Sequence, residues 1–359
     1  MLGGTRCVAL LAEGHFDATD AKTAVGVLRY RPEAVAAVID STRAGRTARD
    51  CAGVGGDVPV VADVAAAAAL GANALVIGIA PQGGGLPPAW RPLLRDAIAR
   101  GWTIYSGLHV FLGDDPELGA LAAASGAAIH DVRRPPAALP IAAARAARLD
   151  AAVVLTVGSD CNVGKMTAAL ELERELTRRG VRAAFVATGQ TGIFIAGEGV
   201  AVDAIPADFV AGAIEARVLA AARDTEVVVV EGQGSLFHPG YSGVTLGLLH
   251  GAAPSALVLC HQVARTQMRV GGEHDPAIPI ASLAALRAAY EAAAAWVRPA
   301  RVIGVALHTG GLDEPAARAA VAAAAAELGV PATDPVRFGA GPLADAVLAR
   351  AGRTHAPHA

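Results

Sequence analysis

A strand, a glycine loop and a helix follow one another in the stretch VLTVGSDCNVGKMTAAL, residues 154–170. The apolar run ends at Val157, the loop extends from Gly158 to Gly164, and Lys165 opens the helix. Such a turn directs free backbone N–H groups and the positive end of a helix dipole at one point, here beside a lysine ammonium. We therefore expect a loop that binds a phosphate or diphosphate.

This loop departs in two ways from the nucleotide-hydrolysing pattern G-x4-G-K-[ST]. Five residues separate its glycines, and Met166 stands where a hydroxyl side chain would hold Mg²⁺. Thr167 lies one residue further on, which rotates its side chain by about 100° around a helix, and a thioether is a poor ligand for Mg²⁺. The pattern thus favours phosphate binding over efficient nucleotide hydrolysis. The residues expected to hold the phosphorylated ligand are Gly158, Ser159, Asp160, Asn162, Val163, Gly164, Lys165, Met166 and Thr167.

Short apolar runs alternate with Ala-rich helical stretches along the whole chain. Continuous apolar strands separated by helices indicate an α/β fold with parallel sheets covered on both faces. Strands are predicted at 7–12, 35–40, 59–62, 74–79, 103–107, 127–132, 151–157, 182–187, 226–231, 255–260 and 301–306. Helices are predicted at 63–70, 88–100, 117–125, 164–179, 208–222, 242–250, 282–296 and 315–328.

The chain is long enough for two domains, since it has 359 residues. Three prolines in RRPPAALP, residues 133–140, break regular structure and mark a linker. We therefore predict one α/β domain at 1–140 and a second, containing the glycine loop, at 141–359.

Composition excludes several classes of partner. A net charge of -3 without a basic stripe argues against nucleic acid. The four cysteines form no C-x-x-C pair, which argues against a zinc site or a disulfide framework and fits a reducing cytosol. The apolar run at 64–80 is shorter than the ~20 residues that cross a bilayer, and the first 30 residues lack a signal-peptide pattern. We expect a cytoplasmic protein without membrane contact.

A second polar segment, EVVVVEGQGSLFHPGYSG at 226–243, follows an apolar strand. Glu231 would lie at the carboxyl edge of the sheet beside the glycine loop, because ligands of such sheets bind where the strands end. The segment can also be an ordinary strand exit, but it is too polar and too rich in glycine for a core. Its further candidate site residues are Gln233, Ser235, His238 and Tyr241.

Other candidates are weaker. Gln190 and Thr191 of TGQTG follow the strand at 182–187 and are candidates for substrate binding. Asp208 can contact substrate or cap a helix. His261 follows a buried strand and can be a general base or a structural hydrogen-bonding group, while Arg265 can clamp an anion or face solvent.

In the first domain, IAPQGGGLPPAW at 79–90 can cradle an anion or form a mobile turn. DSTRAGRTARD at 40–50, with three arginines and small hydroxyl side chains, suits a polar ligand. We also expect a homo-oligomer, in which the loop at 79–90 faces a partner subunit.

Four segments resemble the D-glutamate N-acetyltransferase-like family, long catalogued as a domain of unknown function: GSDCNVGKMT, TGQTG, PADFVAGAIE and VEGQGSLFHPGYSGVTLGLLHG. The resemblance is densest from about 150 to 310, and IDSTRAGRTA and GIAPQGG carry it in the first 135 residues. It implies a Rossmann-like first domain and a phosphate-loop second domain. It also implies acetyl transfer from acetyl-CoA to the amino group of a D-amino acid such as D-glutamate.

Acyl transfer needs a base for the substrate ammonium, donors for the oxyanion and a clamp for the substrate carboxylate. His238, His261 or Glu231 can be the base, Ser235 the oxyanion donor and Arg265 the clamp, with CoA phosphates on the loop. Burial would help Glu231, because it raises the pKa of a carboxyl group.

Two alternatives remain open. GSDCNVGK and VVEGQG also resemble loops of dethiobiotin synthetase, which suggests an ATP-dependent ligase or kinase with Mg²⁺ held by Thr167 and Glu231. The chain can also be a non-catalytic regulator that binds a nucleotide or CoA. Polar residues at several strand ends favour catalysis.

Overall fold

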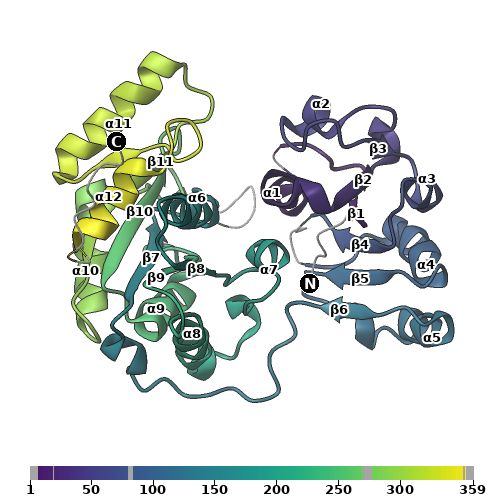
Figure 1. The fold of residues 1–359 in the computed structure, drawn as a ribbon, viewed down its shortest axis with the longest axis horizontal. Helices are drawn as coiled ribbons and strands as arrows, with labels where there is room; N and C mark the ends of the chain where they lie inside the picture. The colour runs from purple at the N-terminus through teal and green to yellow at the C-terminus, as the bar shows by residue number, and fades with distance from the viewer. Residues whose placement is uncertain are drawn as a thin grey trace. The chain divides into compact units, whose positions relative to one another are not determined.

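The computed structural model divides the chain into two compact units (Figure 1). Unit 1 comprises Met1–Pro135 and Gln190–Ala204, and unit 2 comprises Pro136–Gly189 and Ile205–Ala359. The chain therefore passes between the units three times. The structure describes residues 7–18, 20–79, 84–268, 270, 277–350 and 352.

Unit 1 is built on a six-stranded parallel sheet in the order β3-β2-β1-β4-β5-β6. The order reverses between β1 and β4, as in doubly wound Rossmann-like sheets. The strands are β1 (Val8–Leu11), β2 (Val35–Ile39), β3 (Val60–Val61), β4 (Ala74–Ile77), β5 (Thr103–Ser106) and β6 (Ile129–Asp131). The helices are α1 (Lys22–Tyr30), α2 (Ala48–Ala52), α3 (Val64–Ala69), α4 (Arg91–Ala99) and α5 (Pro116–Ser125), with 3-10 turns η1 (Pro32–Ala34), η2 (Ser41–Arg43), η3 (Pro88–Trp90) and η4 (Leu112–Asp114).

A segment from the second half of the sequence completes unit 1. It holds helix α7 (Gln190–Ala196) and the turn η6 (Val202–Ala204), and α7 packs against α1. Phe194 is fully buried in the apolar core of this unit, and Arg31 Nη1 donates to Ile195 O at 3.1 Å. Burial of these apolar residues anchors the segment to unit 1.

Unit 2 has a second six-stranded parallel sheet, in the order β12-β11-β10-β7-β9-β8. β7 is central, and Leu155 on it lies opposite Leu257 on one side and Val230 on the other. The strands are β7 (Ala152–Gly158), β8 (Ala183–Val186), β9 (Val227–Val230), β10 (Ala256–Gln262), β11 (Arg301–His308) and β12 (Ala332–Thr333). The helices are α6 (Lys165–Arg178), α8 (Ala207–Ala221), α9 (Ser242–Ala252), α10 (Leu283–Ala295), α11 (Glu314–Leu328) and α12 (Gly341–Arg350), with the turn η5 (Arg145–Arg148).

The predicted α/β fold class is confirmed by these two parallel sheets. Their strands are apolar along their length because both faces are covered: all four residues of β9 are buried, as are all four of β1. In unit 2, α6 packs with α12, and α9 packs with α8 and α10, so helices shield the sheet (Figure 1). Among the described residues, no helix combines the length and the apolar character needed to span a membrane.

Every predicted strand is present, most of them shortened at their ends. The prediction missed α1, α2, α7, α12 and the two-residue strand β12. Helix α1 begins after Ala21, which makes no side-chain cap, and α2 has only five residues. Such short elements form because they are packed against a sheet, and their sequences alone carry little signal.

Candidate functional site

The predicted glycine loop joins β7 to α6 at the centre of the sheet of unit 2. Asn162 and Gly164 have φ angles of 56° and 99°, so the chain turns through left-handed conformations before the helix. A Cβ atom on Gly158 would lie 2.9 Å from Val163 Cγ2 and 3.1 Å from Lys165 Nζ. The loop therefore closes tightly and brings the lysine side chain back over the end of the strand.

Lys165 is the cation of this loop. Its side chain is buried, and its Nζ donates to Asp160 O at 2.6 Å. Burial lowers the pKa of Lys165, while Cys161, Cys260, Asp160 and Glu231 act in the opposite direction. The first N–H groups of α6 have no acceptor within the helix. A buried ammonium beside such donors suits an anion.

An ion pair braces the loop. The buried carboxylate of Asp160 accepts from Cys161 N at 2.7 Å and from Arg265 Nη1 at 3.0 Å. Arg265 Nη1 also donates to Cys161 O, and only 10% of the Arg265 side chain is exposed. These contacts give Arg265 a role in holding the loop, and its role as a substrate clamp stays a prediction.

Glu231 follows β9 and lies near the loop, as expected from the strand order. Its Oε2 accepts from the backbone N of Thr188 at 2.9 Å and of Gly189 at 3.2 Å, and its Oε1 accepts from Gln233 Nε2 at 3.3 Å. Burial raises the pKa of Glu231 to about 7, although the backbone donors and Lys165 lower it. A carboxyl group that titrates near neutrality can accept a proton from a substrate.

The glycine after Glu231 has a packing role. Gly232 N donates to Thr156 Oγ1 at 2.9 Å, and a Cβ atom on Gly232 would lie 1.7 Å from Thr156 O. Only glycine fits at position 232, where the chain after β9 crosses β7. The crossing brings Glu231 and Lys165 close together.

Ser235 lies in a buried network below the loop. Tyr290 OH donates to Gly158 O at 2.7 Å and accepts from Leu236 N at 3.2 Å, and Ser235 Oγ accepts from Phe237 N at 3.3 Å. Ser235 is fully buried. Its predicted role as oxyanion donor stays a prediction.

His238 is oriented by its own turn. Its Nδ1 accepts from Gly240 N at 3.1 Å, and its ring packs on Tyr241 with the ring centroids 4.5 Å apart. Since the lone pair of Nδ1 is used, the neutral imidazole carries its proton on Nε2. The geometry favours His238 as a hydrogen-bond donor over its predicted role as a base.

His261 contacts the start of the loop. Its Nδ1 lies 2.9 Å from Ser159 Oγ. Burial and the charge of Arg265 lower the pKa of His261, although Glu327 raises it. The imidazole is therefore neutral at pH 7, and it can orient Ser159 or act as a base.

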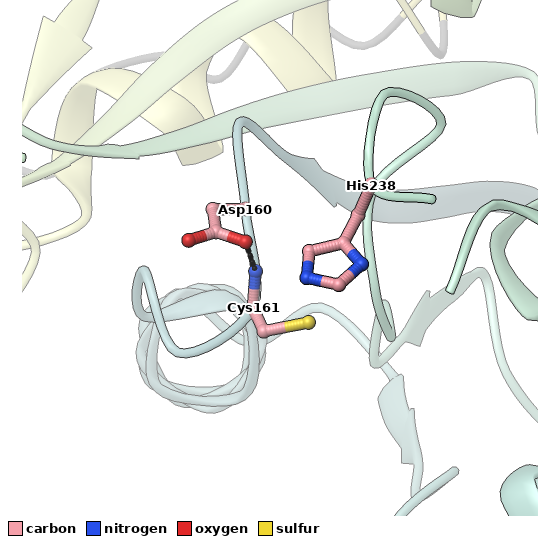
Figure 2. Close-up of side chains that lie close together, drawn as sticks. All are labelled: Asp160, Cys161 and His238. Carbon is pink, nitrogen blue, oxygen red and sulfur yellow. Dashed lines mark hydrogen bonds between the residues drawn. The ribbon is translucent and has the colours of Figure 1, made fainter. Parts of the chain in front are cut away.

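Asp160, Cys161 and His238 form a cluster beside the loop, in which the possible ligand atoms lie within 4.8 Å of one another (Figure 2). Cysteine and histidine are common zinc ligands. Here, however, the start of α6, Lys165 and Arg265 supply positive charge, and Nδ1 of His238 already accepts from Gly240 N. The surroundings favour an anion over a cation.

Two predicted substrate-binding residues lie in unit 1. Gln190 and Thr191 open α7, where they contact Thr23 of α1: Gln190 Nε2 donates to Thr23 Oγ1 at 3.3 Å, and the two threonine hydroxyls lie 2.9 Å apart. Arg133 Nε also lies 3.4 Å from Gln190 Oε1. Gln190 and Thr191 thus contact the start of α1, the helix after β1, where the strand order of unit 1 reverses.

Asp40, the acid at the end of β2 in unit 1, has its oxygens bound by neighbouring residues of the same unit. In dinucleotide-binding sheets such an acid binds a ribose hydroxyl. Asp40 is instead fully buried and accepts from Gly14 N at 3.1 Å, Phe16 N at 3.0 Å and both N and Oγ1 of Thr42. The segment at 40–50, predicted to suit a polar ligand, thus uses its first residue to fold the loop after β1. In the segment at 79–90, Ala80–Gly83 lie outside the described residues.

The remaining predicted residues are less constrained. Asp208 is exposed in the first turn of α8, and the N-cap is Pro206. Tyr241 is half exposed over His238, while Met166 and Thr167 are half-buried in the first turn of α6. The sequence did not single out Thr156, Cys161, Thr188 or Tyr290. Thr188 lies within the quoted TGQTG segment, whereas nothing local marks Tyr290.

Comparison with known families assigns both halves of the chain. Residues 140–344 match a domain of unknown function described as a P-loop domain, DUF1611, and residues 41–135 match its Rossmann-like N-terminal partner, DUF1611_N. These two descriptions agree with the two sheets and with the loop at the centre of the second.

Relatives that match most of the chain support this family assignment. The chain is 40% identical over 334 residues to a D-glutamate N-acetyltransferase of Tritonibacter scottomollicae, covering 93% of this chain and 96% of the relative. It is 39% identical over 274 residues to a protein of the same name from a Pseudoalteromonas species, covering 76% and 80%. A crystal structure of a DUF1611 family protein from Anabaena variabilis superposes with a TM-score of 0.90 at 42% identity, covering 96% of this chain and all of that one. The chain belongs to the DUF1611 family and is an N-acetyltransferase.

Proposed function

We propose that this enzyme transfers an acetyl group from acetyl-CoA to the amino group of a D-amino acid such as D-glutamate, and that its glycine loop binds phosphates of CoA. The observation that carries the proposal is the anion cradle formed by the loop, the start of α6 and the buried Lys165. The names of the two relatives supply the substrate class.

The composition of the loop supports CoA as its ligand. CoA phosphates need to be held during acetyl transfer and are not cleaved, so no Mg²⁺-binding hydroxyl is required after Lys165. Met166 occupies that position. The long pantetheine arm of CoA lets the thioester extend past the loop towards the segment 231–241.

Glu231 is the proposed base. The substrate arrives as an ammonium ion and must lose a proton before its nitrogen attacks the thioester carbonyl. A carboxyl group with a pKa of about 7 is partly ionised at neutral pH and can take that proton. The new C–N bond forms, the C–S bond breaks, and the CoA thiolate leaves and takes up a proton.

His238 is the proposed donor to the developing negative charge. Its Nδ1 accepts from Gly240 N, so a neutral ring would carry its proton on Nε2, and that N–H is proposed to stabilise the oxyanion or the leaving thiolate. Arg265 is proposed to contribute to binding of the substrate carboxylate through the guanidinium atoms other than Nη1, which braces Asp160.

An ATP- and Mg²⁺-dependent ligase or kinase is the second candidate. It is favoured by the position of Glu231 close to Lys165, where an acid would hold Mg²⁺ in a nucleotide-hydrolysing site. Met166 after the lysine and the raised pKa of Glu231 count against it, because Mg²⁺ prefers ionised oxygen ligands.

Calorimetry separates the two candidates. Acetyl-CoA and Mg-ATP are titrated into the wild type, into Lys165→Met and into the control Arg178→Met, which alters an exposed cation on the same helix. We expect metal-independent binding of acetyl-CoA that Lys165→Met weakens at least about tenfold, because charge-assisted hydrogen bonds contribute about 1.5–3 kcal/mol, and that the control retains. Binding of ATP alone, dependent on Mg²⁺, contradicts the proposal.

A further inference from the structure

Unit 2 has a pocket at the edge of its sheet where the strands begin. The pocket has a volume of about 520 Å³, within the range of about 300–1,000 Å³ that is typical of small-molecule sites. It is lined by Ala152, which opens β7, and by the residues just before the neighbouring strands β8, β9 and β10. The glycine loop follows the other end of β7, so this pocket lies at the opposite edge of the same sheet.

The lining of this pocket is rich in charge. It contains three arginines and two acids, namely Arg182, Arg298, Arg350, Asp150 and Glu226. Arg182 and Glu226 compensate each other, since Glu226 Oε2 accepts from Arg182 N at 3.1 Å and lies 4.0 Å from Arg182 Nε. Among the residues that the structure describes, the other three make no ion pair. Two guanidinium groups and one carboxylate therefore stay uncompensated.

The two uncompensated arginines come from different elements and influence each other. Arg298 follows α10, and Arg350 is the last residue of α12. Burial and the charge of Arg350 lower the pKa of Arg298, so the two like charges interact. Such a pair is stabilised by an anion that both guanidinium groups contact.

Helix capping explains only part of this arrangement. The last carbonyl groups of a helix attract cations, which accounts for Arg350 and for the bond at 3.3 Å from Arg298 Nη1 to Ala253 O at the end of α9. Within the described part of the chain, Nε and Nη2 of Arg298 have no partner. Capping thus leaves donors of Arg298 available to the pocket.

We propose that this pocket binds an acidic amino acid at a site separate from the glycine loop. The two carboxylates of such a ligand match the guanidinium groups of Arg298 and Arg350, and its ammonium group matches the carboxylate of Asp150. A phosphate ion fits less well, because it would leave most of the pocket empty and would be repelled by Asp150. The inference does not rest on the proposed function, since it concerns the other edge of the sheet.

The test is calorimetric titration of D-glutamate and of L-glutamate, without acetyl-CoA, into the wild type and Arg350→Gln. The control is Arg318→Gln, which alters an exposed cation on α11. We expect at least one enantiomer to bind, Arg350→Gln to weaken that binding at least about tenfold through loss of a charge-assisted hydrogen bond, and the control to retain it. Arg298→Gln should weaken it similarly, with circular dichroism confirming that each variant is folded.

A second arm tests the chemistry of the ligand. Glutarate, which lacks the ammonium group of glutamate, and inorganic phosphate should each bind severalfold more weakly than glutamate. Asp150→Asn should abolish the preference for glutamate over glutarate. Lys165→Met, which alters the glycine loop, should leave the binding that depends on Arg350 unchanged.

Absence of binding of both enantiomers, or equal affinity of the wild type and Arg350→Gln, overturns the inference. Phosphate that binds as tightly as glutamate also overturns it and marks the pocket as a site for an adventitious ion only. Loss of acetyl-CoA binding in Lys165→Met with retained glutamate binding supports two separate sites. Failure of the wild type to bind acetyl-CoA would contradict the proposed function alone.

Discussion

The two sheets of this enzyme use the same edge in opposite ways. In parallel α/β sheets, ligands bind at the carboxyl ends of the strands. In unit 2 that edge collects an anion cradle, a buried ammonium on Lys165 and a carboxyl group on Glu231 that titrates near neutrality. In unit 1 the chain itself occupies the equivalent edge, because Asp40 folds the loop after β1 and α7 covers the start of α1.

This contrast shows that a fold does not confer a site. Both sheets are doubly wound, yet the acids that follow their strands, Asp40 and Glu231, have different surroundings. The acid of unit 1 accepts four hydrogen bonds from neighbouring loop residues. Glu231 in unit 2 also accepts hydrogen bonds from backbone N–H groups, but burial raises its pKa to about 7.

The largest expected effect comes from the acid of unit 2. Glu231→Gln keeps the shape and the hydrogen-bond acceptor but removes the base, so kcat should fall about 10²–10⁴-fold with little change in thermal stability. Steady-state kinetics with acetyl-CoA and D-glutamate measures it. A loss below about threefold would remove Glu231 from the mechanism.

The acid of unit 1 should show the opposite profile. Asp40→Ala removes the acceptor of the N–H groups of Gly14 and Phe16 and leaves that of Phe16 buried without it, which should destabilise the protein by about 2–4 kcal/mol. Affinity for acetyl-CoA, measured well below the unfolding temperature, should stay within about twofold. Lost affinity with unchanged stability would assign Asp40 to a ligand site.

Glu231 also predicts a pH dependence. Its folded pKa of about 7 exceeds the ordinary 4.5, so the folded state binds the proton more tightly than the unfolded state. Stability contributed by this group is therefore present below about pH 4.5 and lost as the pH rises to about 7, by about 1–3 kcal/mol. Over the same upper range, kcat/KM should rise as the base ionises.

Urea denaturation at several pH values, compared between the wild type and Glu231→Gln, isolates this contribution. The difference in unfolding free energy between the two proteins should change between about pH 4.5 and 7 and be constant above. A difference that does not vary with pH would contradict the raised pKa.

The smallest effect concerns α7. Thr191→Val removes the hydroxyl that contacts Thr23 and should destabilise the protein by about 1 kcal/mol. If Thr191 has only this structural role, the KM for the amino acid stays unchanged. If it also binds substrate, as predicted from the sequence, that KM rises at least about tenfold. Unit 1 would then contribute to substrate binding as well as unit 2.

Local patterns made most of the site in unit 2 predictable. The strand, loop and helix around Lys165 are continuous in sequence, and Glu231 ends an apolar strand. The supporting contacts were not predictable, because they join distant residues: Arg265 pairs with Asp160, and Tyr290 binds Gly158. The packing of α7 against unit 1 was not predictable either, because apolar residues such as Phe194 do not indicate which sheet they will cover.

Hydrogen–deuterium exchange with and without acetyl-CoA tests the contrast between the two sheets most directly. We expect slower exchange on binding in peptides that cover the loop at 158–166 and no change in peptides that cover 12–17 and 40–43 of unit 1. Slower exchange in the unit 1 peptides, with the glycine loop unaffected, would contradict it.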